Sequence, residues 1–215
     1  MEQEMKYHLE GLKPKQVKVL RQMGQTMQER GFYLGGGTAL AIYFGHRLSV
    51  DLDWFIPDRI NDALILAESL RGAGLDFVTT QTGPGSLHGT ILGVRLTFLE
   101  YHYALLKSVT RWNDMGCSLA SLDDLACMKL SAIAQRGGRK DFCDIYFLGT
   151  KHRPLKDLLG LYRRKFKIKD IGSVLYGLSY FDDADHEPMP HMLVDVQWRT
   201  IKKTIQGWVK ELSRV

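Results

Sequence analysis

A run of three glycines, followed by two aspartates with one residue between them, constrains the fold of this chain more than any other feature. The glycines, residues 35–37, precede an apolar segment long enough for a short helix, and Asp51 and Asp53 lie in a strand-like segment after it. Side chains on a strand alternate between its two faces, so Ser49, Asp51 and Asp53 share one face. The other face is apolar and is expected to be buried; it carries Val50, Leu52 and Trp54.

Two carboxylates about 7 Å apart on one strand face are suited to Mg²⁺, with Mn²⁺ as the alternative ion. Mg²⁺ completes its shell with water and phosphate oxygens, so a nucleoside triphosphate (NTP) fits as substrate. Glycines let a phosphate approach the backbone, and a helix starting at Thr38 would add unpaired N–H groups. Each half alone is weak, since Asp-x-Asp is commonly a solvated strand edge and Gly-Gly-Gly a turn. In this order they resemble the signature of the nucleotidyltransferase fold shared with DNA polymerase beta.

Composition sets broad limits on the partners of the chain. Its 215 residues carry a net charge of +5, which suits a polyanionic partner without establishing one. Three widely spaced cysteines do not form a zinc pattern and indicate reduced core thiols in a cytoplasmic protein; they are Cys117, Cys127 and Cys143. The longest apolar stretch, residues 32–44, is interrupted by glycines and too short for a bilayer, so no membrane partner is expected.

Hydrophobic periodicity predicts an α/β (α+β) chain. A polymerase-beta-like nucleotidyltransferase core with a small mixed sheet is expected over residues 1–115, and a helical C-terminal lobe completing the cleft over residues 116–215. Predicted strands cover residues 32–34, the two aspartates, and residues 75–80, 86–92 and 94–101. Predicted helices cover residues 14–29, the segment from Thr38, residues 59–71 and 121–135, a segment from Arg139, residues 155–168, and a closing helix from Trp198 to Trp208.

The strand over residues 94–101 raises the question of a third acid. Its alternation buries Val94, Leu96 and Phe98 and leaves Thr97 where the polymerase-beta arrangement has a further carboxylate. Glu100 is the nearby acid, but it has the wrong parity. Either a bulge or strand end reorients Glu100, or an acid from another element completes the site, and we favour the second alternative.

Cations in the second half of the chain have two interpretations. Lys129 and Arg136 interrupt an otherwise apolar helical stripe, either because their side chains extend to solvent or because they face a triphosphate in the cleft. Asp141 and Asp144, three residues apart, share a face of the next helix. The basic run over residues 163–169 is either a solvated helix face or an RNA contact.

Several segments, in order, resemble the motifs of the AbiEii/AbiGii-type nucleotidyltransferase toxin family; they cover residues 34–40, 46–55, 128–133, 139–144 and 180–185. The resemblance implies that Asp51 and Asp53 bind metal and that Lys129 binds or orients the nucleotide. It also implies a further catalytic acid, for which Asp144 has a better claim than Asp141. The expected phosphate- and substrate-binding residues are Gly36, Gly37, Thr38, His46, Arg47, Ser49, Arg136, Arg139 and Lys140.

The implied activity is transfer of a nucleoside monophosphate from an NTP to a hydroxyl acceptor, with tRNA or another RNA as the acceptor. By the same resemblance the protein would be the toxin of a toxin–antitoxin or phage-defence pair, with a separately encoded antitoxin as partner. The alternative is a catalytically degenerate module of the same fold that binds nucleotide or RNA. Thr97 favours that alternative. The argument against it is the joint presence of five residues, namely Asp51, Asp53, Lys129, Arg139 and Asp144.

Overall fold

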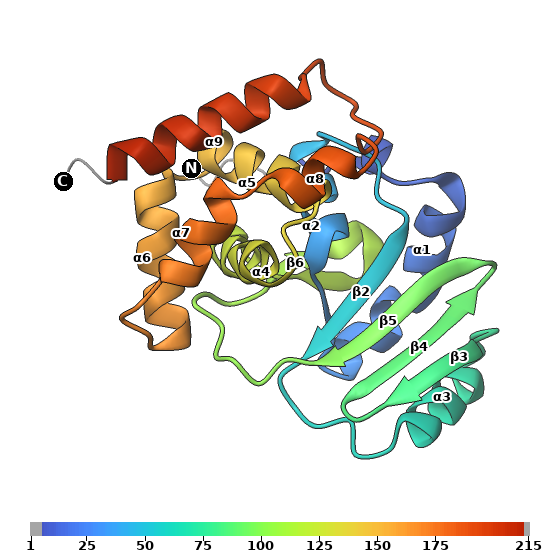
Figure 1. The fold of residues 1–215 in the computed structure, drawn as a ribbon. Coiled ribbons are helices and arrows are strands. Elements are labelled where there is room, and N and C mark those ends of the chain that lie inside the picture. The colour runs from blue at the N-terminus through green and yellow to red at the C-terminus, as the bar shows by residue number, and fades with distance from the viewer. Residues whose placement is uncertain (1–5, 213–215) are drawn as a thin grey trace, which may run out of the picture.

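The computed structural model describes residues 6–212, and its central feature is one mixed β-sheet (Figure 1). Within this range seven strands pair in the order β3-β4-β5-β2-β1-β7-β6. The strands are β1 (Tyr33–Leu34), β2 (Asp51–Ile56), β3 (Val78–Gly83), β4 (Ser86–Ile91), β5 (Val94–Glu100), β6 (Thr110–Trp112) and β7 (Cys117–Leu119). The predicted α/β fold class with a small mixed sheet is confirmed.

Helices cover the sheet and build a second body beside it (Figure 1). They are α1 (Pro14–Glu29), α2 (Gly36–Phe44), α3 (Ala63–Gly72), α4 (Leu122–Gln135), α5 (Arg139–Lys151), α6 (Leu155–Phe166), α7 (Gly172–Ser179), α8 (Asp182–His186) and α9 (Trp198–Leu212), with short 3₁₀ turns η1 (Leu9–Gly11) and η2 (Asn113–Met115). Helix α3 packs on β3 and β4, and α1 packs on β5 and β7. Helix α4 contacts α5, α6 and α7, and α9 lies across α5 and α7.

The pairing of β2 with β5 sets which side chains meet on the sheet. These strands are parallel, with Asp51 opposite Arg95 and Asp53 opposite Thr97. The predicted apolar faces are confirmed as core for Leu52, Trp54, Leu96 and Phe98, which are all fully buried or nearly so. The prediction was wrong for Val50, which precedes β2 and is 46% exposed. The opposite face of the same two strands therefore carries the polar side chains.

Local sequence signals place several helices correctly. Helix α1 has the predicted bounds, with Pro14 in its first turn. Helix α4 begins after Ser121, whose hydroxyl accepts a hydrogen bond from the Asp124 amide, as predicted. Helix α2 begins at Gly36, two residues before the predicted Thr38.

The cysteines are buried free thiols, as expected.

Several local predictions were wrong. The strand expected over residues 75–80 is β3, which covers Val78–Gly83. The helix expected over residues 59–71 starts at Ala63, because Asp62 caps it by accepting from the Leu64 and Ile65 amides. Leu64 is 57% exposed instead of lying on the sheet. The helix expected over residues 155–168 ends at Phe166, because Lys167 adopts a left-handed conformation with φ +52°.

The predicted boundary between residues 115 and 116 stays a prediction. Strand β7 lies beyond it and is hydrogen-bonded to β1, so the sheet draws on both predicted parts. In residues 6–212 every helix falls short of the length and apolar character needed to cross a membrane.

Candidate active site

A cleft of about 990 Å³ lies between the polar face of β2 and β5 and the helices α4 and α6. Nine of the residues predicted for the site line it: Gly36, Gly37, Arg47, Ser49, Asp51, Asp53, Lys129, Arg136 and Lys140. Five other predicted residues lie behind this lining: Thr38, His46, Arg139, Asp141 and Asp144. The structure thus separates predicted residues that line the cleft from predicted residues that do not.

The two aspartates of β2 differ in their surroundings. Burial raises the pKa of Asp53, the nearby charge of Asp51 raises it further, and Lys129 acts in the opposite direction. Asp51 is 33% exposed and accepts a hydrogen bond of 2.6 Å from Nε of Arg95, its neighbour on β5. Because the Arg95 side chain is itself 69% exposed, this pair is a weak surface contact.

The pair of carboxylates fits a divalent cation. Oxygen ligands suit Mg²⁺ and Mn²⁺, and a cation between Asp51 and Asp53 would relieve the repulsion that raises the pKa of Asp53. Within residues 6–212 these two acids are not joined by a third acid, histidine or cysteine. Water and phosphate oxygens would therefore supply the other ligands.

The glycine turn makes room for the functional side chains. Gly36 has φ +62°, and a Cβ there would lie 2.7 Å from Oδ2 of Asp53. A Cβ on Gly37 would lie 2.3 Å from a guanidinium nitrogen of Arg47. A larger residue at either position would contact Asp53 or Arg47 even without a ligand in the cleft. The two glycines therefore let Asp53 and Arg47 approach the start of α2.

The hydroxyl group of Thr38 holds the strand that carries the acids. It lies 2.6 Å from Oγ of Ser49 and donates to the backbone carbonyl of Asp51. Thr38 is buried beneath the cleft, whereas Ser49 reaches its lining. The hydroxyl group of Thr38 is therefore directed to β2, and its predicted role in phosphate binding stays a prediction.

Asp144 lies at the centre of a buried ion cluster, which we define as His46, Arg47, Lys129 and Asp144. The carboxylate accepts two hydrogen bonds from Arg47, each 2.8 Å, and contacts Nε2 of His46 at 2.8 Å and Nζ of Lys129 at 2.7 Å. Burial on its own would raise the pKa of Asp144, but Arg47 and Lys129 hold it well below its usual range. His46 is fully buried, and burial lowers its pKa.

Asp141 joins the cluster to the exposed rim of the cleft. Its carboxylate accepts a 2.8 Å hydrogen bond from Lys129 and another of 2.8 Å from Nε of Arg136. Arg139, by contrast, is directed to α8, where it donates to the carbonyl groups of Ala184 and Asp185. Lys129 and Arg136 thus border the cleft as predicted, while Arg139 fixes the C-terminal segment.

Glu100 does not complete the acidic pair. Its carboxylate accepts a 2.6 Å hydrogen bond from the Ile60 amide and contacts His102 at 2.8 Å, away from the cleft lining. Thr97 lies opposite Asp53, as the alternation predicted. Of the two alternatives for a third acid, reorientation of Glu100 is therefore excluded, and the second finds no acid within the described residues.

Sequence reasoning missed other residues of the cleft. Lys13 and His191 line it from outside the sheet, and no local signal distinguishes them. Outside the cleft lining, Lys165 belongs to the basic run that was expected to be a solvated face or an RNA contact, yet it is buried and donates to Asp124 at 2.7 Å. Phe55 also lines the cleft. The sequence could have predicted this position, because Phe55 follows Asp51 and Asp53 at the same alternation on β2.

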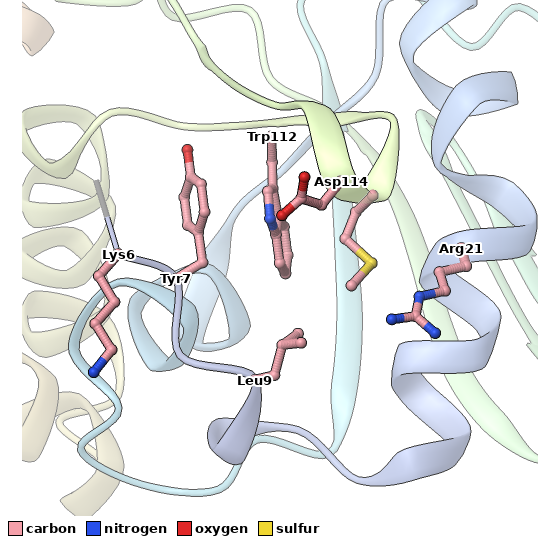
Figure 2. Close-up of a pocket in the computed structure, with 7 residues that line it drawn as sticks. Lys6, Tyr7, Leu9, Arg21, Trp112 and Asp114 are labelled. Carbon is pink, nitrogen blue, oxygen red and sulfur yellow. The ribbon is translucent and has the colours of Figure 1, made fainter. Parts of the chain in front are cut away.

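A second cavity of about 380 Å³ lies between the N-terminal segment, α1 and η2 (Figure 2). Tyr7 and Trp112 stand beside each other in it, with ring centroids 4.8 Å apart, and Asp114 and Arg21 lie at its edge. None of the predicted site residues lines it. The cleft with the two acids is therefore the candidate active site.

A helix opened by glycines, an Asp-x-Asp strand beside it and a cation-lined opposite wall define the class of the protein as a nucleotidyltransferase. Residues 18–111 match the family model described as nucleotidyl transferase AbiEii toxin, type IV TA system. The chain belongs to this AbiEii nucleotidyltransferase toxin family, as its motifs indicated.

One relative and two solved structures are similar to this chain over most of its length. The uncharacterized protein aq_aa25 of Aquifex aeolicus (strain VF5) is 36% identical over 182 residues, 84% of this chain and 87% of that protein. JHP933 from Helicobacter pylori has a TM-score of 0.58 at 18% identity, covering 94% of this chain and 95% of that one. MenT4, a nucleotidyltransferase toxin from Mycobacterium tuberculosis H37Rv, has a TM-score of 0.58 at 12% identity, covering 91% and 82%. At these identities the structural matches show the fold.

Proposed function

We propose that this nucleotidyltransferase transfers a nucleoside monophosphate from an NTP to a hydroxyl group of RNA, with tRNA as the favoured acceptor. The observation that carries the proposal is the single cleft in which Asp51 and Asp53 face a wall of cations. That wall consists of Arg47, Lys129, Arg136 and Lys140. Two acids suit a metal ion and the cations suit a triphosphate, so together they match a metal–NTP substrate.

Asp51 and Asp53 would hold Mg²⁺. Bound there, the ion would neutralise charge on the α-phosphate and lower the pKa of the attacking hydroxyl group. The acceptor oxygen forms a bond to the α-phosphorus while the bond to the β-phosphate breaks, and pyrophosphate leaves. The proton of the acceptor passes to solvent. Lys129 and Arg136 balance the charge of the leaving pyrophosphate from their fixed positions.

Asp144 and Asp141 act on the site through other residues in this proposal. Both carboxylates are fully buried and already bound to cations. A group with two charged partners is a poor proton acceptor, since its pKa is lowered. We therefore assign Asp144 and Asp141 to the positioning of Arg47, Lys129 and Arg136.

The proposed biological role is that of a toxin whose activity a separately encoded antitoxin restrains. Membership of the AbiEii family supports this role, and the fold neighbour MenT4 is described as a toxin. A cytoplasmic location, where NTPs and RNA occur together, is part of the proposal.

The test is incubation of purified protein with each α-labelled NTP, Mg²⁺ and total RNA. We expect label in RNA with the wild type and a loss of at least about 100-fold in Asp51→Asn and Asp53→Asn. Asp76→Asn removes an exposed acid outside the cleft and should keep full transfer. Label in protein instead of RNA would contradict the proposed acceptor.

The degenerate binding module remains the second candidate function. Two observations favour it. Thr97 lies opposite Asp53, where the polymerase-beta arrangement has a further acid, and Arg95 forms a surface contact with Asp51. NTP binding without label in any acceptor, and without release of pyrophosphate, would establish it.

A further inference from the structure

The cleft extends beyond the acids and ends against aromatic side chains. We define the aromatic wall as five rings that line this end: Phe55, Tyr101, Tyr103, Tyr162 and Phe166. They come from three separate elements, namely β2, the segment after β5, and α6. Nζ of Lys165 lies 5.1 Å from the centroid of the Tyr101 ring.

The rings of the aromatic wall form one continuous series. The centroid of Tyr101 lies 5.7 Å from that of Phe55 and 5.3 Å from that of Tyr103. Phe166 continues the series, 4.7 Å from Tyr103 and 4.7 Å from Tyr162. Tyr103 is nevertheless 53% exposed, so much of its ring is available to a ligand in the cleft.

The sheet fixes the order of the acids and the aromatic wall. Asp51, Asp53 and Phe55 follow each other at intervals of two on β2 and share its open face. Two residues on a strand span about 7 Å, so the wall begins about that far from Asp53. The glycine turn runs along the same order, with Gly35 against the ring of Phe55, Gly36 against Asp53 and Gly37 against Arg47.

This order matches the parts of a nucleotide. A triphosphate suits the glycine turn and the cations, the α-phosphate suits the acids, and a ribose fits the space between the acids and the wall. A nucleobase has two apolar faces that stack well on aromatic rings. We propose that the aromatic wall binds the base of the NTP, with Tyr103 as its stacking platform. This inference rests on the proposed function and adds the orientation of the nucleotide.

The test measures two probes in the presence of Mg²⁺, an NTP analogue with an α,β-methylene bridge and inorganic tripolyphosphate, which lacks a base. Tyr103→Ala should weaken binding of the analogue by between about 5-fold and about 150-fold and leave tripolyphosphate binding unchanged. Tyr103→Phe keeps the ring and should bind both probes like the wild type. Tyr176→Ala is the matched control, because Tyr176 is a 69% exposed tyrosine on α7, outside the cleft lining.

Several results would overturn the inference. Equal losses for both probes in Tyr103→Ala would indicate a structural effect. Unchanged binding of the analogue together with a higher KM for RNA would assign the wall to the acceptor. Equal affinity of the wild type for the analogue and for tripolyphosphate would show that the base is not bound.

The experiments distinguish failure of the base site from failure of the proposed function. If Tyr103 shows the expected pattern and no label enters RNA, the base site stands and RNA transfer is wrong. If the wild type binds neither probe, both the base site and the proposed function are wrong.

Discussion

Asp53 and Asp144 carry the same chemical group in opposite electrostatic surroundings. Burial and the neighbouring charge of Asp51 raise the pKa of Asp53, and Lys129 compensates for its ionised form only in part. Burial acts on Asp144 in the same direction, but Arg47 and Lys129 outweigh it and the pKa falls. A metal ion would therefore benefit Asp53, whereas Asp144 already has its counterions.

Replacing Asp144 tests its assignment as a positioning residue. In Asp144→Asn the cations Arg47 and Lys129 stay buried with their principal counterion removed, which costs about 3–5 kcal/mol of unfolding free energy. The lowered pKa means that Asp144 contributes its stabilisation above the unfolded value of about 4 and loses it as the pH falls through the folded value. The difference in unfolding free energy between Asp144→Asn and the wild type should thus be largest at neutral pH and should shrink in strong acid.

Urea unfolding at several pH values measures this difference, with Asp76→Asn as the neutral control. A variant that unfolds like the wild type but has lost transfer would instead make Asp144 a catalytic group.

The partners of Lys129 could not be derived from the sequence. Its place on an apolar stripe of α4 predicted either a path to solvent or a cleft position. Which of these holds depends on Asp141 and Asp144, and they reach Lys129 only because α4 packs on α5. The acids of β2 were easier to predict, because strand alternation is a local property.

At the scale of elements, two helical glycines have different surroundings. A Cβ on Gly149 of α5 would lie 2.4 Å from the Trp208 ring of α9. On Gly160 of α6 an added Cβ would meet no heavy atom of the described chain within 4 Å. Gly149 therefore allows α9 to approach α5, while Gly160 has no such role.

Alanine at these two glycines should have effects of opposite sign. Gly160→Ala should stabilise the protein by about 0.5–1 kcal/mol, the usual difference between alanine and glycine in a helix interior. Gly149→Ala should destabilise it by about 1–3 kcal/mol, because Trp208 must move. Thermal unfolding of both variants provides the measurement, and a higher melting temperature for Gly149→Ala would show that α9 does not pack as described.

Helix ends show where local sequence signals stop being sufficient. Ser121 and Pro14 mark their helices without ambiguity. The helix predicted over residues 59–71 follows Asp58, which was expected to cap it, but the structure shows that Asp62 caps α3. Lys165 of α6 was misassigned because its partner, Asp124, lies on another helix.

At the scale of the molecule, the cleft depends on contacts between the sheet and the helices. Lys165 of α6 donates to the carbonyl group of Ala104, in the segment after β5, and to Asp124 of α4. Arg47, which follows α2, is held by Asp144 of α5. These buried ion pairs connect both walls of the cleft, and β7 extends the sheet past residue 115. We therefore expect residues 6–212 to unfold as one unit.

A ligand in the cleft should raise the stability of that whole unit. At 100 times its Kd, a bound α,β-methylene NTP analogue with Mg²⁺ adds about 2.7 kcal/mol, which corresponds to roughly 5–10 °C in Tm for a chain of this size. Chelation of Mg²⁺ or Asp53→Asn should remove most of this shift, and Asp76→Asn should retain it. Differential scanning calorimetry measures these shifts and shows whether the chain unfolds in one transition or in two. Two transitions, with one of them insensitive to the ligand, would mean that the sheet and the helices unfold separately and that the cleft does not join them.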